Sequence, residues 1–186
     1  MGNLIQICGL PRSGTGFLSV LLALNPSCIS YHELISKKDN YKQILEKGLL
    51  EYDFVADCST YGFYPNHSYP ESKKVLIRRD IYSSMESCEK IFRVSVDIVE
   101  YIKHTEVMCQ WVSYNEVLEI EYEDLFRIET LENIWIHCFG SKNGFIQEKV
   151  NNLLDMNIQM QYPRNVIEDS KTIARVKNQL NLELCQ

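Results

Sequence analysis

Residues 4–17 decide the fold class, and they read LIQICGLPRSGTGF. The apolar run at residues 4–8 is typical of a buried parallel strand, and it ends at Gly9. A glycine-containing turn follows, and residues 17–24 then have the composition of a helix that ends before Asn25 and Pro26. A strand, a glycine turn and a helix in this order indicate the start of an α/β fold.

The rest of the chain repeats this alternation of strands and helices. Apolar runs predict further strands at residues 28–31, 53–58, 74–78 and 117–120. Helices are expected at residues 38–51, 81–91, 95–114, 131–139, 145–154 and 167–182, and residues 59–72 are expected to form a loop. We therefore expect residues 1–186 to form one three-layer α/β domain, with a mostly parallel central sheet and flanking helices.

Charge and composition exclude several classes of protein. Lys and Arg number 19 against 25 Asp and Glu, a formal net charge of −6 that argues against a general nucleic-acid binder. The longest apolar stretch, residues 17–24, is too short to span a membrane. The seven cysteines are an odd number and include no C-x-x-C pair. They are typical of free thiols in a reducing compartment, so we expect a cytoplasmic protein.

The turn after the first strand has the character of an anion-binding loop. Glycines let a backbone turn its N–H groups inward, and a helix N-terminus adds partial positive charge. Gly9 and Gly14 have the spacing of a Walker A loop, G-x-x-x-x-G-K-[ST]. However, Thr15 and Gly16 stand where the Walker lysine and Mg²⁺-binding hydroxyl would be, which argues against a nucleoside triphosphatase or a P-loop kinase.

The loop residues Pro-Arg-Ser-Gly-Thr, at positions 11–15, resemble the 5′-phosphosulfate loop of another family. This family is the sulfotransferases that use 3′-phosphoadenosine 5′-phosphosulfate (PAPS). A second motif of that family is a strand ending in Arg-Asp-Pro with a serine eight residues after the arginine. Here Arg79 and Asp80 end a predicted strand, Ile81 replaces the proline and Ser87 has the matching spacing.

A third stretch, residues 117–125, is similar to a late strand of the same family that is followed by Tyr-Glu-Asp-Leu. The cytosolic branch also has an R-K-G-x-x-G loop that is absent here, so the resemblance is to the bacterial and Golgi types. The resemblance implies a P-loop-like nucleotide-binding core that binds PAPS and releases 3′-phosphoadenosine 5′-phosphate (PAP). The implied donor-binding residues are Arg12, Ser13, Gly14, Thr15, Gly16, Arg79 and Ser87.

His32 and Glu33 follow the second predicted strand, where the resemblance implies a general base. A carboxylate can accept the proton of an attacking hydroxyl, so we expect Glu33 to be the base and Arg12 to stabilise developing charge. His32 is the competing base. The zinc-protease pattern H-E-x-x-H fails at Ser36, and we expect no metal to be required.

The acceptor is the least defined part of the prediction. His32, Tyr61 and Tyr64 are candidates for binding a small-molecule, glycan or peptide acceptor through its hydroxyl or amine. The sequence predicts a PAPS-dependent sulfotransferase. Two alternatives are a P-loop small-molecule kinase and a non-catalytic nucleotide-binding protein of the same fold.

Overall fold

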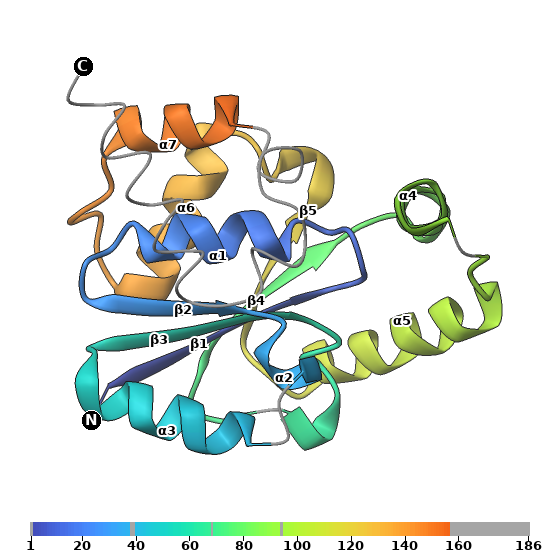
Figure 1. The fold of residues 1–186 in the computed structure, drawn as a ribbon, viewed down its shortest axis with the longest axis horizontal. Coiled ribbons are helices and arrows are strands. Elements are labelled where there is room, and N and C mark those ends of the chain that lie inside the picture. The colour runs from blue at the N-terminus through green and yellow to red at the C-terminus, as the bar shows by residue number, and fades with distance from the viewer. Residues whose placement is uncertain (1, 38–39, 68, 94, 157–186) are drawn as a thin grey trace.

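A computed structural model describes residues 2–37, 40–67, 69–93 and 95–156, and its centre is a five-stranded parallel sheet (Figure 1). The strand order is β2-β3-β1-β4-β5. The strands are β1 (Asn3–Gly9), β2 (Cys28–His32), β3 (Phe54–Thr60), β4 (Lys73–Arg78) and β5 (Val117–Glu121). All four neighbouring pairs are parallel, so the predicted α/β fold with a mostly parallel sheet is confirmed.

Helices cover both faces of this sheet (Figure 1). One face carries α1 (Thr15–Ala23), α6 (Ile128–Phe139) and α7 (Gln147–Asp155). The other carries α2 (Leu34–Lys37), α3 (Tyr41–Glu51) and α5 (Ile98–Ser113). The remaining helix, α4 (Ile81–Phe92), lies beyond the end of β4 and leads into α5.

β1 lies at the centre of the core and is buried on both faces. Ile5 and Ile7 belong to a cluster that includes Trp135 of α6, whereas Cys8 belongs to a second cluster with Trp111 of α5. Alternate strand side chains point to opposite faces of a sheet, so a strand covered on both sides needs apolar residues at successive positions. The exception in β1 is Gln6, which is buried and donates from its side-chain amide to the carbonyl oxygens of Gly62 and His67. This burial fixes where β1 ends and where the following loop emerges.

The order of the strands creates a crevice at one edge of the sheet. β1 connects through α1 to β2 on one side, whereas β4 connects through α4 and α5 to β5 on the other. Where neighbouring parallel strands lead away in opposite directions, their carboxyl ends leave an open crevice that commonly binds ligands. The ends of β1 and β4, with the loops that follow them, form that crevice here.

Several element boundaries differ from those predicted. The helix expected at residues 38–51 begins at Tyr41, the helix expected at 131–139 begins at Ile128, and the short helix α2 was not predicted. The segment expected as a loop over 59–72 instead continues β3 to Thr60 and contains a 3-10 turn, η1 (Pro65–His67). The helix predicted at residues 167–182 lies outside the described residues.

Two properties expected from composition can be examined in the described part of the chain. None of its helices is long and apolar enough to cross a membrane. The cysteines at positions 8, 28, 58, 88 and 138 are buried free thiols, and Cys109 is an exposed one.

Candidate functional site

The loop between β1 and α1 has the backbone geometry of a tight turn into a helix. Arg12 has φ 68° and Gly14 has φ 89°, both in the left-handed region. A Cβ atom on Gly14 would lie 2.5 Å from Cδ2 of Leu125, so this position needs glycine both for its backbone and for space. α1 begins directly after Gly14 without a side-chain cap. Its first turn therefore presents main-chain N–H groups at the edge of the sheet.

Two residues of the β4–α4 segment contact this loop. The Arg79 guanidinium donates a hydrogen bond to the main-chain carbonyl of Arg12, and Ser87 Oγ accepts one from Arg12 Nε at 3.2 Å. The guanidinium of Arg79 also lies 4.0 Å from the centre of the Tyr122 ring. The fold thus brings Arg12 next to Arg79 and Ser87, which lie far from it in the sequence, and both of these residues contact Arg12 directly.

The start of α4 is held by its own cap. The Asp80 carboxylate accepts a hydrogen bond from the main-chain N–H of Ser83 at 2.8 Å. This cap supplies the helix start that a proline at position 81 would otherwise favour. The Ser84 hydroxyl donates to the carbonyl of Pro11 at 2.5 Å, which is a second link between α4 and the loop.

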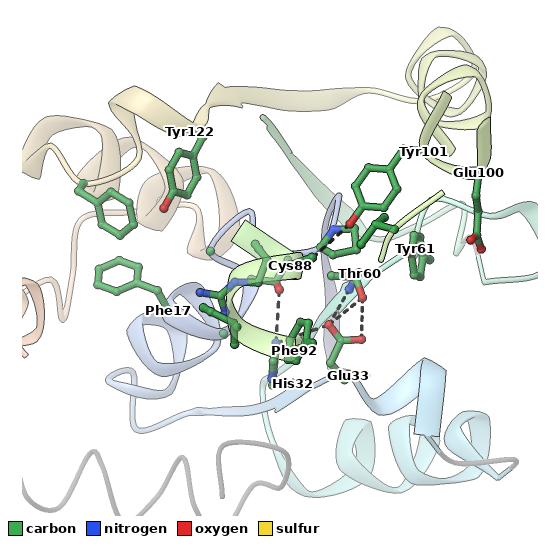
Figure 2. A pocket seen from close by; sticks show the side chains of 18 of the residues that line it. Phe17, His32, Glu33, Thr60, Tyr61, Cys88, Phe92, Glu100, Tyr101 and Tyr122 are labelled. Atoms are coloured by element: carbon green, nitrogen blue, oxygen red, sulfur yellow. Dashed lines mark hydrogen bonds and ion pairs between the residues drawn. The ribbon is translucent and has the colours of Figure 1, made fainter. Parts of the chain in front are cut away.

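Glu33 lies at the end of β2 and turns the chain out of the sheet. Its backbone is left-handed, with φ 60°, and its side chain is only 3% exposed. The carboxylate accepts a hydrogen bond from the main-chain N–H of Thr60 at 3.0 Å, and the Thr60 hydroxyl lies 2.9 Å from both carboxylate oxygens (Figure 2). A left-handed backbone at a non-glycine residue is costly and is found preferentially at functional sites.

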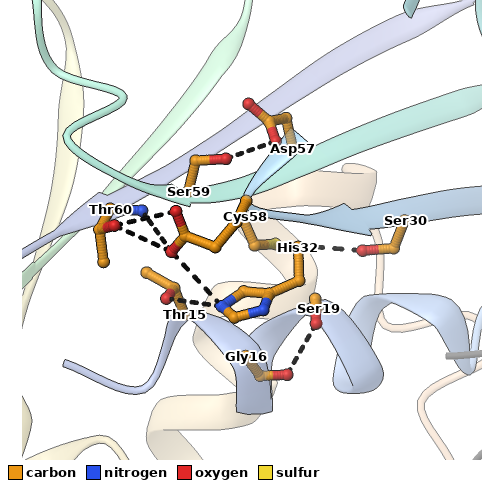
Figure 3. Close-up of polar contacts among 10 residues, drawn as sticks. Thr15, Gly16, Ser19, Ser30, His32, Asp57, Cys58, Ser59 and Thr60 are labelled. Carbon is orange, nitrogen blue, oxygen red and sulfur yellow. Dashed lines mark hydrogen bonds and ion pairs between the residues drawn. The ribbon is translucent and has the colours of Figure 1, made fainter. Parts of the chain in front are cut away.

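His32 connects this carboxylate to the loop. Its Nε2 lies 3.5 Å from Oε1 of Glu33 and 3.3 Å from the hydroxyl of Thr15, the first residue of α1 (Figure 3). Gly16 faces the same ring, because a Cβ atom at position 16 would lie 3.4 Å from it. The two candidate bases therefore form one polar group with the start of α1.

These elements line a cavity of about 710 Å³. Of the predicted site residues, it is lined by Arg12, Gly14, Thr15, Gly16, His32, Glu33 and Tyr61. A cavity of this size accommodates a cofactor-sized ligand. Figure 2 shows Phe17 and Tyr122 on one side of this cavity and Tyr61, Tyr101 and Glu100 on the other.

Four predicted site residues are not in the lining of this cavity. Ser13 is fully buried, and Arg79 and Ser87 contact Arg12 as described above. Tyr64 instead hydrogen-bonds Nδ1 of His104 at 2.5 Å. Tyr64 therefore supports the wall that Tyr61 lines, since the two tyrosine rings pack edge to face with centroids 6.3 Å apart.

The sequence interpretation missed part of the lining. Thr60, Cys88, Phe92, Tyr101 and Tyr122 all line the cavity, and none of them was a predicted site residue. The expected boundary of the third strand placed Thr60 in a loop, although it follows directly after the polar residues Asp57 and Ser59. The residues of α4 and α5 carry no local signal, because tertiary packing decides which helix side chains border a cavity.

A second buried carboxyl group, Asp57 of β3, lies near Glu33. Burial raises the pKa of Asp57 from 3.8 to about 7, and the nearby charge of Glu33 acts in the same direction. The Ser59 hydroxyl opposes this rise by donating a hydrogen bond to Oδ1 of Asp57 at 2.7 Å. The two buried carboxyl groups thus have different partners, and of the two only Glu33 lines the cavity.

Comparisons with known proteins give no family assignment. No protein-family model matches the chain, and no curated protein matches it. The functional conclusion therefore depends on the geometry and chemistry of the residues described above.

Proposed function

We propose that this protein is a PAPS-dependent sulfotransferase with a P-loop-like nucleotide-binding core. The observation that carries the proposal is the convergence of three features at one edge of the sheet. These are the loop of residues 9–16, the pair Arg79 and Ser87, and the buried carboxylate of Glu33. An anion site beside a buried, oriented carboxylate suits the transfer of an anionic group to a nucleophile that must lose a proton.

In this proposal the loop binds the 5′-phosphosulfate of the donor. The main-chain N–H groups at the start of α1 and the guanidinium of Arg12 supply hydrogen bonds and positive charge. The 3′-phosphate binds Arg79 and Ser87. The phosphate replaces the present contacts of these two side chains with Arg12. The Arg79 guanidinium and the Ser87 hydroxyl then both donate to the phosphate oxygens.

The reaction is an in-line displacement at sulfur. The acceptor oxygen forms a new S–O bond, the bridging S–O bond to the 5′-phosphate breaks, and PAP leaves with the bonding electrons. Glu33 accepts the proton of the acceptor hydroxyl, and Arg12 with the loop N–H groups stabilises the charge on the leaving phosphate. Glu33 is our choice as base because its carboxylate lines the cavity and is held by Thr60. His32 contacts it and orients it.

The proposal is tested by supplying ³⁵S-labelled PAPS with a panel of small alcohols, phenols and amines in the presence of EDTA. We expect labelled product and release of PAP, because sulfuryl transfer needs no metal to bridge phosphates. Transfer of phosphate from ATP that requires Mg²⁺ would instead indicate a small-molecule kinase. Binding of PAP without transfer to any acceptor, or to water, would indicate a non-catalytic nucleotide-binding protein.

A further inference from the structure

Thr60 contacts the proposed base more extensively than any other residue for which a contact with Glu33 is described. It ends β3, directly opposite Gly9 of β1, where the anion-binding loop begins. Its main-chain N–H donates to Oε1 of Glu33 at 3.0 Å. Its hydroxyl lies 2.9 Å from Oε1 and 2.9 Å from Oε2.

These contacts follow from how β2 leaves the sheet. The ladder between β2 and β3 pairs His32 with Cys58, and the N–H of Glu33 still donates to the carbonyl of Cys58 at 3.2 Å. The left-handed backbone of Glu33 then carries the chain away from β3. The side chain of Glu33, rather than a β2 carbonyl, accepts the N–H of Thr60. The carboxylate is consequently fixed at the edge of the sheet that borders the cavity.

We infer that Thr60 is a positioning residue for sulfuryl transfer: its N–H and hydroxyl fix the plane of the Glu33 carboxylate for proton transfer. This inference rests on the proposed function, in which Glu33 is the base. The hydroxyl lies equally close to both carboxylate oxygens and can donate its single proton to either one. Rotation of the carboxylate about its bond to the rest of the side chain would move an oxygen away from the hydroxyl, so this contact opposes the rotation. Threonine suits this role, because its β-branched side chain has few rotamers.

A purely structural role would produce the same contacts, so the test must separate the two. Thr60→Val keeps the shape of the side chain and the main-chain N–H but removes the hydroxyl. We expect it to lower kcat about 10- to 100-fold, the effect of losing one hydrogen bond to a charged group. The KM for PAPS should change little. Thr60→Ser, which keeps the hydroxyl, should restore most of the rate.

The decisive comparison uses Glu33→Gln as the background. If Thr60 acts through Glu33, adding Thr60→Val to Glu33→Gln lowers the rate no further. Thr105→Val is a matched control, because the Thr105 hydroxyl bonds only the carbonyl of Tyr101 among the contacts described for it. Thr60→Ala and Thr60→Ser differ by one oxygen, and they replace Thr60→Val if that variant does not fold.

The rate is measured as release of PAP from PAPS, with the fastest acceptor of the panel or with water. A native rate in Thr60→Val, or an undiminished effect of Thr60→Val in the Glu33→Gln background, would overturn the positioning role while leaving the sulfotransferase proposal intact. Absence of PAP release from the native chain would instead overturn the proposed function, and this inference with it.

Discussion

At the scale of single residues, two buried carboxyl groups on adjacent parts of the sheet have different surroundings: Glu33 directly follows β2, and Asp57 lies within β3. Glu33 is held by the N–H and hydroxyl of Thr60, whereas Asp57 receives the hydroxyl of Ser59. The charge of Glu33 contributes to the raised pKa of Asp57.

Replacing Glu33 by Gln tests its role as the base. The amide keeps the shape and a hydrogen-bond acceptor for Thr60 but cannot accept a proton near neutral pH. We expect kcat to fall roughly 10²- to 10⁴-fold, the usual contribution of a positioned acid or base. The affinity for PAP, measured by calorimetry, should change little. A native rate in Glu33→Gln, together with an inactive His32→Asn, would identify His32 as the base.

The raised pKa of Asp57 leads to a separate prediction about how the stability of the fold depends on pH. Its pKa is about 7 in the folded protein against an ordinary value of 3.8, so the folded state holds this proton more strongly. The group therefore stabilises the fold fully at low pH, and this contribution is lost as the pH rises toward about 7. Between these two values, stability falls by on the order of 1 kcal/mol for each pH unit.

The measurement is urea unfolding of the native chain and of Asp57→Asn at several pH values from 4.5 to 8.5. Asparagine keeps the acceptor for Ser59 but does not titrate. We expect the native chain to lose stability relative to Asp57→Asn as the pH rises. Burial lowers the pKa of histidines such as His104, so their contribution to stability increases as the pH rises, opposite to that of Asp57. Both proteins contain these histidines, and the difference between the two stabilities removes their contribution. Parallel pH curves would contradict the prediction.

At the scale of elements, the sequence predicts all five strands and most of the helices in the described part of the chain. The strands were predictable because apolar runs covered on both faces have a plain sequence signal. The short helix α2 was missed because four residues after a left-handed Glu33 show no helical periodicity. Helix ends such as Tyr41 and Ile128 depend on local capping and packing, which shift them by a few residues.

The candidate site was predictable where motifs follow strands, and only there. Arg12, Glu33 and Arg79 were identified because the motifs around them resemble those of the PAPS-dependent sulfotransferases, and each motif follows a predicted strand. Thr60 was misplaced by an error of two residues in the end of β3. Phe92 and Tyr101 were missed, because the sequence does not show that α4 and α5 would border the cavity.

The loop itself can be tested with a pair of glycine substitutions. Gly14 and Gly140 both have positive φ, 89° and 75°, but a Cβ atom on Gly14 meets Leu125 whereas one on Gly140 has no atom within 4 Å. Each alanine variant should lose about 1–2 kcal/mol of stability to backbone strain. Gly14→Ala should lose more, and it should also weaken PAP binding. Equal stabilities and unchanged PAP binding in both variants, by thermal unfolding and calorimetry, would contradict this view of the loop.

At the scale of the whole molecule, an acidic chain of net charge −6 gathers two arginines at one edge of its sheet. Arg12 and Arg79 come from segments after β1 and β4, so the strand order brings them together. A ligand with two separated phosphate groups matches this arrangement, because each arginine then serves one anion. In the proposed function, binding therefore depends on the number and position of the phosphates of the ligand.

The most direct test is calorimetric titration of the native chain with PAP and with AMP, which differ only in the 3′-phosphate. We expect PAP to bind at least about 10-fold more tightly than AMP, as for a charge-assisted contact. Arg79→Ala should remove most of this difference. Equal affinities for PAP and AMP, binding of neither, or an equal loss of both in Arg79→Ala would contradict a 3′-phosphate site at Arg79 and Ser87.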